Sequence, residues 1–190
     1  MLRSLLQQTG LGVLVFGYYH RLSAAQQAVY RQSDALTRVA LPRPRALVAQ
    51  VLVLQRSLQA GRREQVARDA RRLLDGLTEH LEVPRVRVNV LAARPHDDWG
   101  ELHGLYEGAE GRRLACITLW MRTAKRRQVV AFRTFLRTLL HEFCHHLDYV
   151  LYELDDSYHT EGFYQRESSL LSQLLPGRGR RSRGGGASNA

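Results

Sequence analysis

Apolar residues recur at helical spacing in two adjoining segments of the chain, residues 45–59 and 62–81. Steps of three and four residues place side chains on one face of a helix, and Gly61 between the segments is a typical helix terminator. The pattern therefore predicts two helices that are joined by a short turn and pack as an antiparallel pair. Residues 1–40 also have helical character, although their apolar pattern is poorer.

Between residues 85 and 120 the pattern changes from helical spacing to alternation. Residues 85–90 alternate strictly between polar and apolar side chains, as a strand with one buried face does. Short apolar runs at residues 102–106 and 114–120, separated by a Gly-containing turn at 107–111, predict two further strands. We expect these three strands to form a small sheet.

The longest apolar stripe lies between residues 126 and 152, and no Gly or Pro interrupts it. Its apolar positions are Val129, Phe132, Leu136, Leu139, Leu140, Phe143, Leu147 and Val150. This spacing predicts one long helix, and a closing helix follows at residues 165–175. The order of elements predicts an α+β fold in which a small sheet packs on the long helix, preceded by a helical N-terminal region.

The chain divides by composition and pattern into three parts. We expect a helical N-terminal extension at residues 1–60 and one folded domain at residues 61–175. The remaining residues, 176–190, are rich in Arg, Gly and Ser and lack apolar side chains that could form a core. We expect this tail to be disordered.

Within the long helix, His141, Glu142 and His145 form an HExxH motif. Positions i and i+4 lie one turn apart on the same face, so both imidazoles can reach a single point. Two imidazoles at this separation suit Zn²⁺, and Glu142 beside the metal could take a proton from a water molecule there. Asp148 extends this polar row, which packing alone hardly explains because burial of such groups costs free energy. The motif indicates a zinc hydrolase, most often a peptidase.

A catalytic zinc site has three protein ligands, so one more must come from outside the helix. Metzincins require a Gly and a His at the positions where this chain has Asp148 and Leu151, which excludes that class. A thermolysin-like site would use a downstream carboxylate, either Glu161 or Glu167. His159 is the better candidate, because it follows an acidic, turn-prone segment after the helix. The expected zinc ligands are therefore His141, His145 and His159.

The HExxH helix and the trailing His-x-x-Gly-Phe-Tyr motif that starts at His159 resemble the SprT-like and WLM groups of minimal zincin metallopeptidases. The resemblance covers roughly residues 86–175. It implies a minimal zincin-like domain with a three-histidine zinc site, with Phe163 packed behind His159. It also matches residues 114–120 to the edge strand that precedes the active-site helix. Many SprT-like proteins carry a zinc ribbon, but this chain has two cysteines and no Cys-x-x-Cys pair, so no ribbon is expected.

Three further residues of the helix lie close to the expected ligands. His146 projects about 100° away from His145, so we expect it at the surface or behind the site. Asp148 either accepts a hydrogen bond from the second ring nitrogen of a ligand histidine or is a surface acid. Cys144 is expected to pack as a small apolar side chain.

Polar residues outside the helix leave alternatives open. Tyr158 and Tyr164 either pack in the core or at the rim, or donate a hydrogen bond to a developing oxyanion. We expect His103 on a strand near the cleft.

Arginine supplies nearly all of the positive charge, since Lys125 is the one lysine and the net charge is +10. Such a charge attracts nucleic acid nonspecifically, so weak binding of nucleic acid stays open; an arginine-rich proteome would produce the same charge without any such partner. Two cysteines fit a reducing compartment. The apolar run at residues 11–19 lacks a cleavage site and is too short to span a bilayer. We expect a cytoplasmic protein.

We interpret the chain as a zinc-dependent metallohydrolase, a metallopeptidase that cleaves a peptide or protein substrate with Glu142 as the proton acceptor. Residues 114–120 would present backbone groups to an extended peptide. Two alternatives remain: a nucleic-acid-associated protease of the SprT type, and a non-catalytic protein with a structural metal or none.

Overall fold

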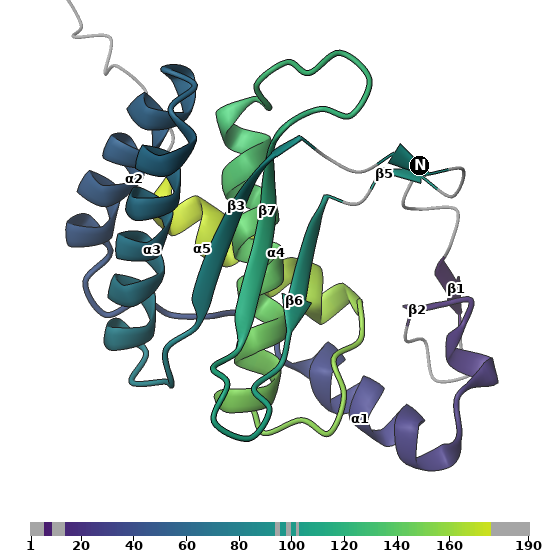
Figure 1. The fold of residues 1–190 in the computed structure, drawn as a ribbon. Helices are drawn as coiled ribbons and strands as arrows, with labels where there is room; N and C mark the ends of the chain where they lie inside the picture. The colour runs from purple at the N-terminus through teal and green to yellow at the C-terminus, as the bar shows by residue number, and fades with distance from the viewer. Residues whose placement is uncertain (1–5, 9–13, 94–95, 98–99, 102, 176–190) are drawn as a thin grey trace, which may run out of the picture.

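A three-stranded mixed sheet forms the centre of the structure (Figure 1). The computed structural model describes residues 6–8, 14–93, 96–97, 100–101 and 103–175, and the tail predicted at 176–190 lies outside these residues. The strands, in spatial order, are β3 (Arg87–Ala93), β7 (Cys116–Arg122) and β6 (Gly104–Glu107). β7 runs parallel to β3 and antiparallel to β6. The α+β class predicted from the sequence is confirmed.

β7 lies in the middle of the sheet. Ile117 of β7 pairs with Val88 on one side and with Tyr106 on the other. The expectation that residues 114–120 form an edge strand and receive a peptide is therefore wrong, because both sides of β7 are already paired. Among the described residues β6 pairs with β7 alone, so β6 is the edge strand.

The described part of the chain contains five α-helices. They are α1 (Ala24–Ala35), α2 (Pro44–Gln59), α3 (Arg63–His80), α4 (Phe132–Val150) and α5 (Glu161–Leu174). α4 packs against β6 and β7, whereas α3 packs against β3 and α2 (Figure 1). Buried apolar side chains of α2, α3, the sheet, α4 and α5 form one core. None of the described helices is both long and apolar enough to cross a membrane.

The predicted pair of helices is present as α2 and α3, which lie side by side and are joined through Gly61 at a φ of +68°. The long helix begins later than its apolar pattern predicts. Val129 pairs with Arg122 in an isolated bridge, and the Val130 N–H donates to the Met121 carbonyl, so this segment is extended. α5 begins earlier than predicted because the Thr160 hydroxyl accepts a hydrogen bond from the Phe163 N–H and caps the helix.

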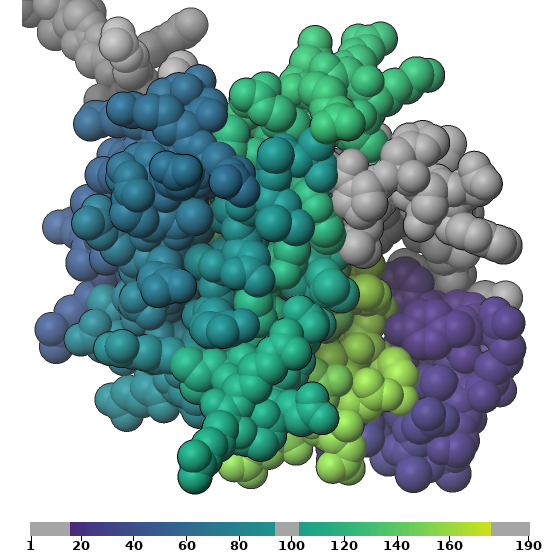
Figure 2. All heavy atoms as spheres, viewed as in Figure 1, coloured from purple at the N-terminus to yellow at the C-terminus, as the bar shows by residue number. Residues whose placement is uncertain are grey.

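Residues 1–40 are less helical than the sequence predicts. In their described part, α1 and a single 3₁₀ turn (Tyr19–Arg21) are helical, and β1 (Leu6–Gln8) pairs with β2 (Leu14–Phe16). A second two-stranded pair consists of β4 (His96–Asp97) and β5 (Gly100–Glu101). The N-terminal segment, purple in Figure 2, lies against the yellow-green segment that contains the α4–α5 loop.

Close packing of α1 on α5 at Gly162 leads to a first prediction. A Cβ at Gly162 would overlap the backbone carbonyl of Asp34, and backbone cannot move aside as a flexible side chain can. Gly162→Ala should lower the free energy of unfolding by about 1–3 kcal/mol, because overpacking outweighs the better helix propensity of alanine. Urea denaturation followed by circular dichroism measures the change.

Gly108→Ala is the matched control, because nothing lies within 4 Å of the added Cβ at that exposed position. Its stability should stay within about 0.5 kcal/mol of wild type. A Gly162→Ala variant as stable as Gly108→Ala would contradict the described docking of α1.

Candidate metal centre

Three histidines meet where α4 faces the loop that precedes α5. His141 and His145 lie one turn apart on α4, and His159 comes from the loop. Nε2 of His159 lies 3.0 Å from Nε2 of His141 and 3.1 Å from Nε2 of His145. In a tetrahedral site with Zn–N bonds of about 2.0–2.1 Å, neighbouring nitrogens are roughly 3.3 Å apart. The three side chains could therefore hold a metal ion.

Hydrogen bonds behind two of these rings decide which nitrogen carries the proton in the neutral form. His141 Nδ1 lies 3.0 Å from Glu167 Oε2, and because a carboxylate only accepts, Nδ1 donates. His145 Nδ1 lies 2.7 Å from Ser157 Oγ, which itself donates to Asp148 Oδ2 at 2.7 Å, so Nδ1 donates here too. In both rings Nε2 is left with its lone pair toward the centre, as metal binding requires.

The surroundings of His145 and His159 favour the neutral form of these two rings. Burial lowers the pKa of His145 to about 3, and the neighbouring His159 and His141 add to this effect. Burial also lowers the pKa of His159 to about 4, again with a contribution from His141. Metal ions bind neutral imidazole, so at neutral pH these ligands need not lose a proton first. The donor chemistry of the cluster therefore fits a divalent ion such as Zn²⁺.

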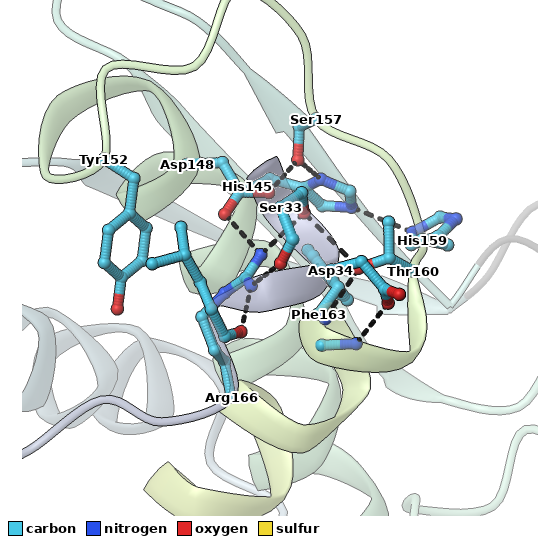
Figure 3. A network of polar contacts seen from close by, with 12 residues as sticks. Ser33, Asp34, His145, Asp148, Tyr152, Ser157, His159, Thr160, Phe163 and Arg166 are labelled. Carbon is cyan, nitrogen blue, oxygen red and sulfur yellow. Dashed lines mark hydrogen bonds and ion pairs between the residues drawn. The ribbon is translucent and has the colours of Figure 1, made fainter. Parts of the chain in front are cut away.

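Behind His145 the polar network reaches a buried ion pair (Figure 3). Arg166 Nη2 lies 2.7 Å from Asp148 Oδ1, and both side chains are 0% exposed. Arg166 also donates to the backbone carbonyls of Ser33 and Leu36 at the end of α1. Burial raises the pKa of Asp148, whereas the Arg166 charge opposes this shift. Asp148 is buried, so the alternative of a surface acid is wrong. It contacts His145 through Ser157 and not directly.

The N-terminal segment holds the loop that carries His159. The Tyr18 hydroxyl donates to the His159 carbonyl at 3.2 Å, and the Gly162 N–H donates to Asp34 Oδ1 at 2.9 Å. Figure 3 shows Asp34 and Thr160 on the side of the network where α1 meets this loop. The Phe163 ring lies beneath the three imidazoles, with its centroid 5.0, 4.7 and 5.1 Å from those of His141, His145 and His159. The loop is therefore fixed by polar contacts on one side and by an aromatic ring on the other.

A cleft of about 590 Å³ opens onto the three histidines. Glu142 lines it and is only 7% exposed; burial raises its pKa to about 7, although the nearby His141 opposes the shift. Gly104 of β6 passes directly beside this carboxylate, because a Cβ at Gly104 would lie 2.5 Å from Glu142 Oε1. Only a residue without a side chain leaves Glu142 in this position.

The two carboxylates considered as rival ligands lie outside the cluster. Glu161 is exposed in the first turn of α5. Glu167 is buried behind His141, where Oε1 also pairs with Arg137 Nε at 3.0 Å. Glu167 therefore contacts the ring nitrogen of His141 that faces away from the centre.

His146 is 1% exposed, which excludes the surface position and leaves the expected alternative, a position behind the site. Its Nε2 donates to the Pro84 carbonyl at 2.8 Å, and its Nδ1 accepts from the Tyr106 hydroxyl at 3.1 Å. These contacts tie α4 to the segment before β3 and to β6. Cys144 is fully buried in the apolar core, as expected.

The tyrosines of the site differ from those considered in the sequence. Tyr158 lies in an aromatic group with Tyr18, and Tyr164 stacks on His159 with ring centroids 5.9 Å apart. Tyr106 and Tyr149 line the cleft instead, and neither belongs to the HExxH motif or to the motif that starts at His159. His103 lines the cleft as expected, but it lies just before β6 and not on a strand.

Comparisons of the chain with protein-family models, with curated proteins and with solved structures give no match. Of the features that the resemblance to SprT-like peptidases implies, the structure supports the cluster of three histidines. The candidate site therefore rests on the geometry of this chain.

The contact between Glu167 and His141 leads to a second prediction. Glu167→Gln keeps the size of the side chain but removes the charge that orients His141, so zinc affinity should fall roughly 10- to 100-fold. Competition against a chromophoric chelator measures the affinity. Glu161→Gln, a change of an exposed carboxylate on the same helix, should leave it unchanged. Complete loss of zinc in Glu167→Gln would instead indicate that Glu167 is itself a ligand. An unchanged zinc affinity would show that Glu167 does not orient His141.

Proposed function

We propose that this protein is a zinc-dependent metallopeptidase of the minimal zincin type, with His141, His145 and His159 as the metal ligands. The observation that carries the proposal is the convergence of three Nε2 atoms, two of them on rings whose Nδ1 donates to an acceptor. The resemblance of both motifs to SprT-like and WLM peptidases supports the same reaction class.

The number of ligands favours catalysis over a purely structural metal. Structural zinc sites fill all four tetrahedral positions with protein ligands, whereas catalytic sites keep one position open. Among the residues that the structure describes, the cluster contains no fourth His, Cys, Asp or Glu. The cleft reaches the same three side chains, so a substrate has access to them.

Zn²⁺ at this site would supply Lewis-acid chemistry, which lowers the pKa of a water molecule and polarises a carbonyl group. Glu142 supplies proton transfer. Its carboxylate faces the cleft beside His141, and a pKa of about 7 suits a group that both accepts and returns a proton near neutral pH. In the proposed reaction Glu142 takes a proton from the attacking water and delivers it to the leaving amine.

We place the peptide substrate along β6. Gly104, Leu105 and Tyr106 line the cleft, and the free side of an edge strand can pair with an extended peptide. Because Gly104 lies against Glu142, a peptide bound there would run beside the proposed proton acceptor. β6 takes the role that the sequence pattern assigned to residues 114–120.

Glu142→Gln separates binding of the metal from the chemistry. The amide keeps the shape of the side chain but cannot accept a proton, so peptide hydrolysis should fall by roughly 10²- to 10⁴-fold. Zinc content and melting temperature should stay near wild type, because Glu142 is not a ligand in this proposal. Cleavage of a mixed peptide library, read by mass spectrometry, measures the activity.

Glu161→Gln should cleave the library as wild type does, because that carboxylate is exposed at the start of α5. A Glu142→Gln variant with wild-type activity would rule out the mechanism. A wild-type protein that holds zinc and cleaves no peptide of the library would favour a structural metal.

A further inference from the structure

Arg137 lines the cleft of the candidate metal centre, one helical turn before His141 on α4. Its Nε lies 3.0 Å from Glu167 Oε1, while Glu167 Oε2 accepts from His141 Nδ1 at 3.0 Å. One carboxylate therefore fixes both the guanidinium and the imidazole. The Glu167 side chain is 6% exposed, whereas that of Arg137 is 51% exposed.

The guanidinium of Arg137 has N–H groups that do not contact Glu167. An arginine carries five N–H groups, and the ion pair with Glu167 is made through Nε. In the described part of the chain, Glu167 is the one partner that Arg137 has. Nη1 and Nη2 hold the other four N–H groups, arranged as the fork that matches the two oxygens of a carboxylate.

Arg166 is a second arginine near the site, and its contacts are those of a purely structural guanidinium. Arg166 pairs with Asp148, is fully buried, and donates to Ser33 Oγ as well as to the carbonyls of Ser33 and Leu36. Arg137 has no comparable set of acceptors among the described residues, although it backs the other α4 histidine through Glu167. The charge of Arg137 compensates the buried Glu167 carboxylate, and the Nη groups of the guanidinium remain available to the cleft.

We propose that Arg137 binds a carboxylate of the substrate, so that the protein acts on peptides with a carboxylate next to the cleaved bond. This inference rests on the proposed function and names its substrate class. Arg137 lies one turn, about 6 Å along the helix, before His141. An extended peptide advances about 3.3–3.6 Å per residue, so the carboxylate belongs to a residue within one or two positions of the cleaved bond. The carboxylate is either the C-terminus of the peptide or an acidic side chain.

Three hydroxamates with the same short backbone test the carboxylate site without any need for turnover, because the hydroxamate group binds zinc. The first ends in a free carboxylate, the second ends in the carboxamide, and the third ends in the carboxamide but carries a Glu side chain. Isothermal titration calorimetry gives the dissociation constant of each for the zinc-loaded wild type, Arg137→Gln and Arg133→Gln. Arg133 is an exposed arginine of the same helix outside the cleft.

At least one carboxylate compound should bind wild type about tenfold or more tightly than the carboxamide, as charge-assisted hydrogen bonds allow. This ratio should fall to near one in Arg137→Gln and should persist in Arg133→Gln. Preference for the first compound identifies a C-terminal carboxylate, and preference for the third identifies an acidic side chain. The carboxamide compound reports on the metal site itself, so its affinity shows whether Arg137→Gln has disturbed Glu167 and His141.

Two results would overturn the carboxylate site while leaving the metallopeptidase intact. One is binding of all three compounds to wild type within about twofold of each other. The other is an equal loss of the ratio in Arg137→Gln and Arg133→Gln. If zinc-loaded wild type binds none of the compounds, the proposed function fails, and the carboxylate site fails with it.

Discussion

The buried ion pair between Arg166 and Asp148 connects the parts of the candidate metal centre. Asp148 accepts a hydrogen bond from the Ser157 hydroxyl, which in turn accepts one from His145, so the pair sets the orientation of one candidate ligand. Arg166 comes from α5 and binds carbonyls at the end of α1, where a cation also complements the helix dipole. Removal of one partner would leave an uncompensated buried charge, which typically costs about 3–5 kcal/mol. The N-terminal segment is therefore part of the construction of the site.

The two candidate ligands on α4 are supported in the same way. His141 is backed by Glu167, which pairs with an arginine, and His145 is backed through Ser157 by Asp148, which also pairs with an arginine. Each carboxylate pairs with a cation on the side away from the histidine. This pairing offsets the free-energy cost of burying the carboxylate beside the apolar core. The difference lies in the cations, because one is enclosed by backbone carbonyls and the other, Arg137, stands half exposed in the cleft. This difference in exposure is the basis for the proposal that Arg137 binds a carboxylate of the substrate.

Features with a local cause could be predicted from the sequence, whereas features that depend on distant contacts could not. Helical spacing and Gly61 sufficed for α2 and α3, and the i, i+4 spacing with a trailing His159 sufficed for the cluster. The place of β7 in the middle of the sheet depends on pairing with two other strands, which alternation within one segment does not reveal. The role of Arg166 depends on Ser33, far away in the chain. The sequence offers Glu167 as a candidate metal ligand. Its actual position behind His141 depends on how α5 packs on α4, which the sequence pattern does not show.

The zinc K-edge X-ray absorption spectrum of the purified protein, quantified against its zinc content, tests the central claim most directly. We expect about one zinc per chain, with three imidazole nitrogens at about 2.0–2.1 Å and one further oxygen ligand. In His159→Ala the imidazole contribution should drop from three to two. A sulfur ligand at about 2.3 Å, or no bound zinc after expression with added zinc, would contradict a three-histidine metal centre.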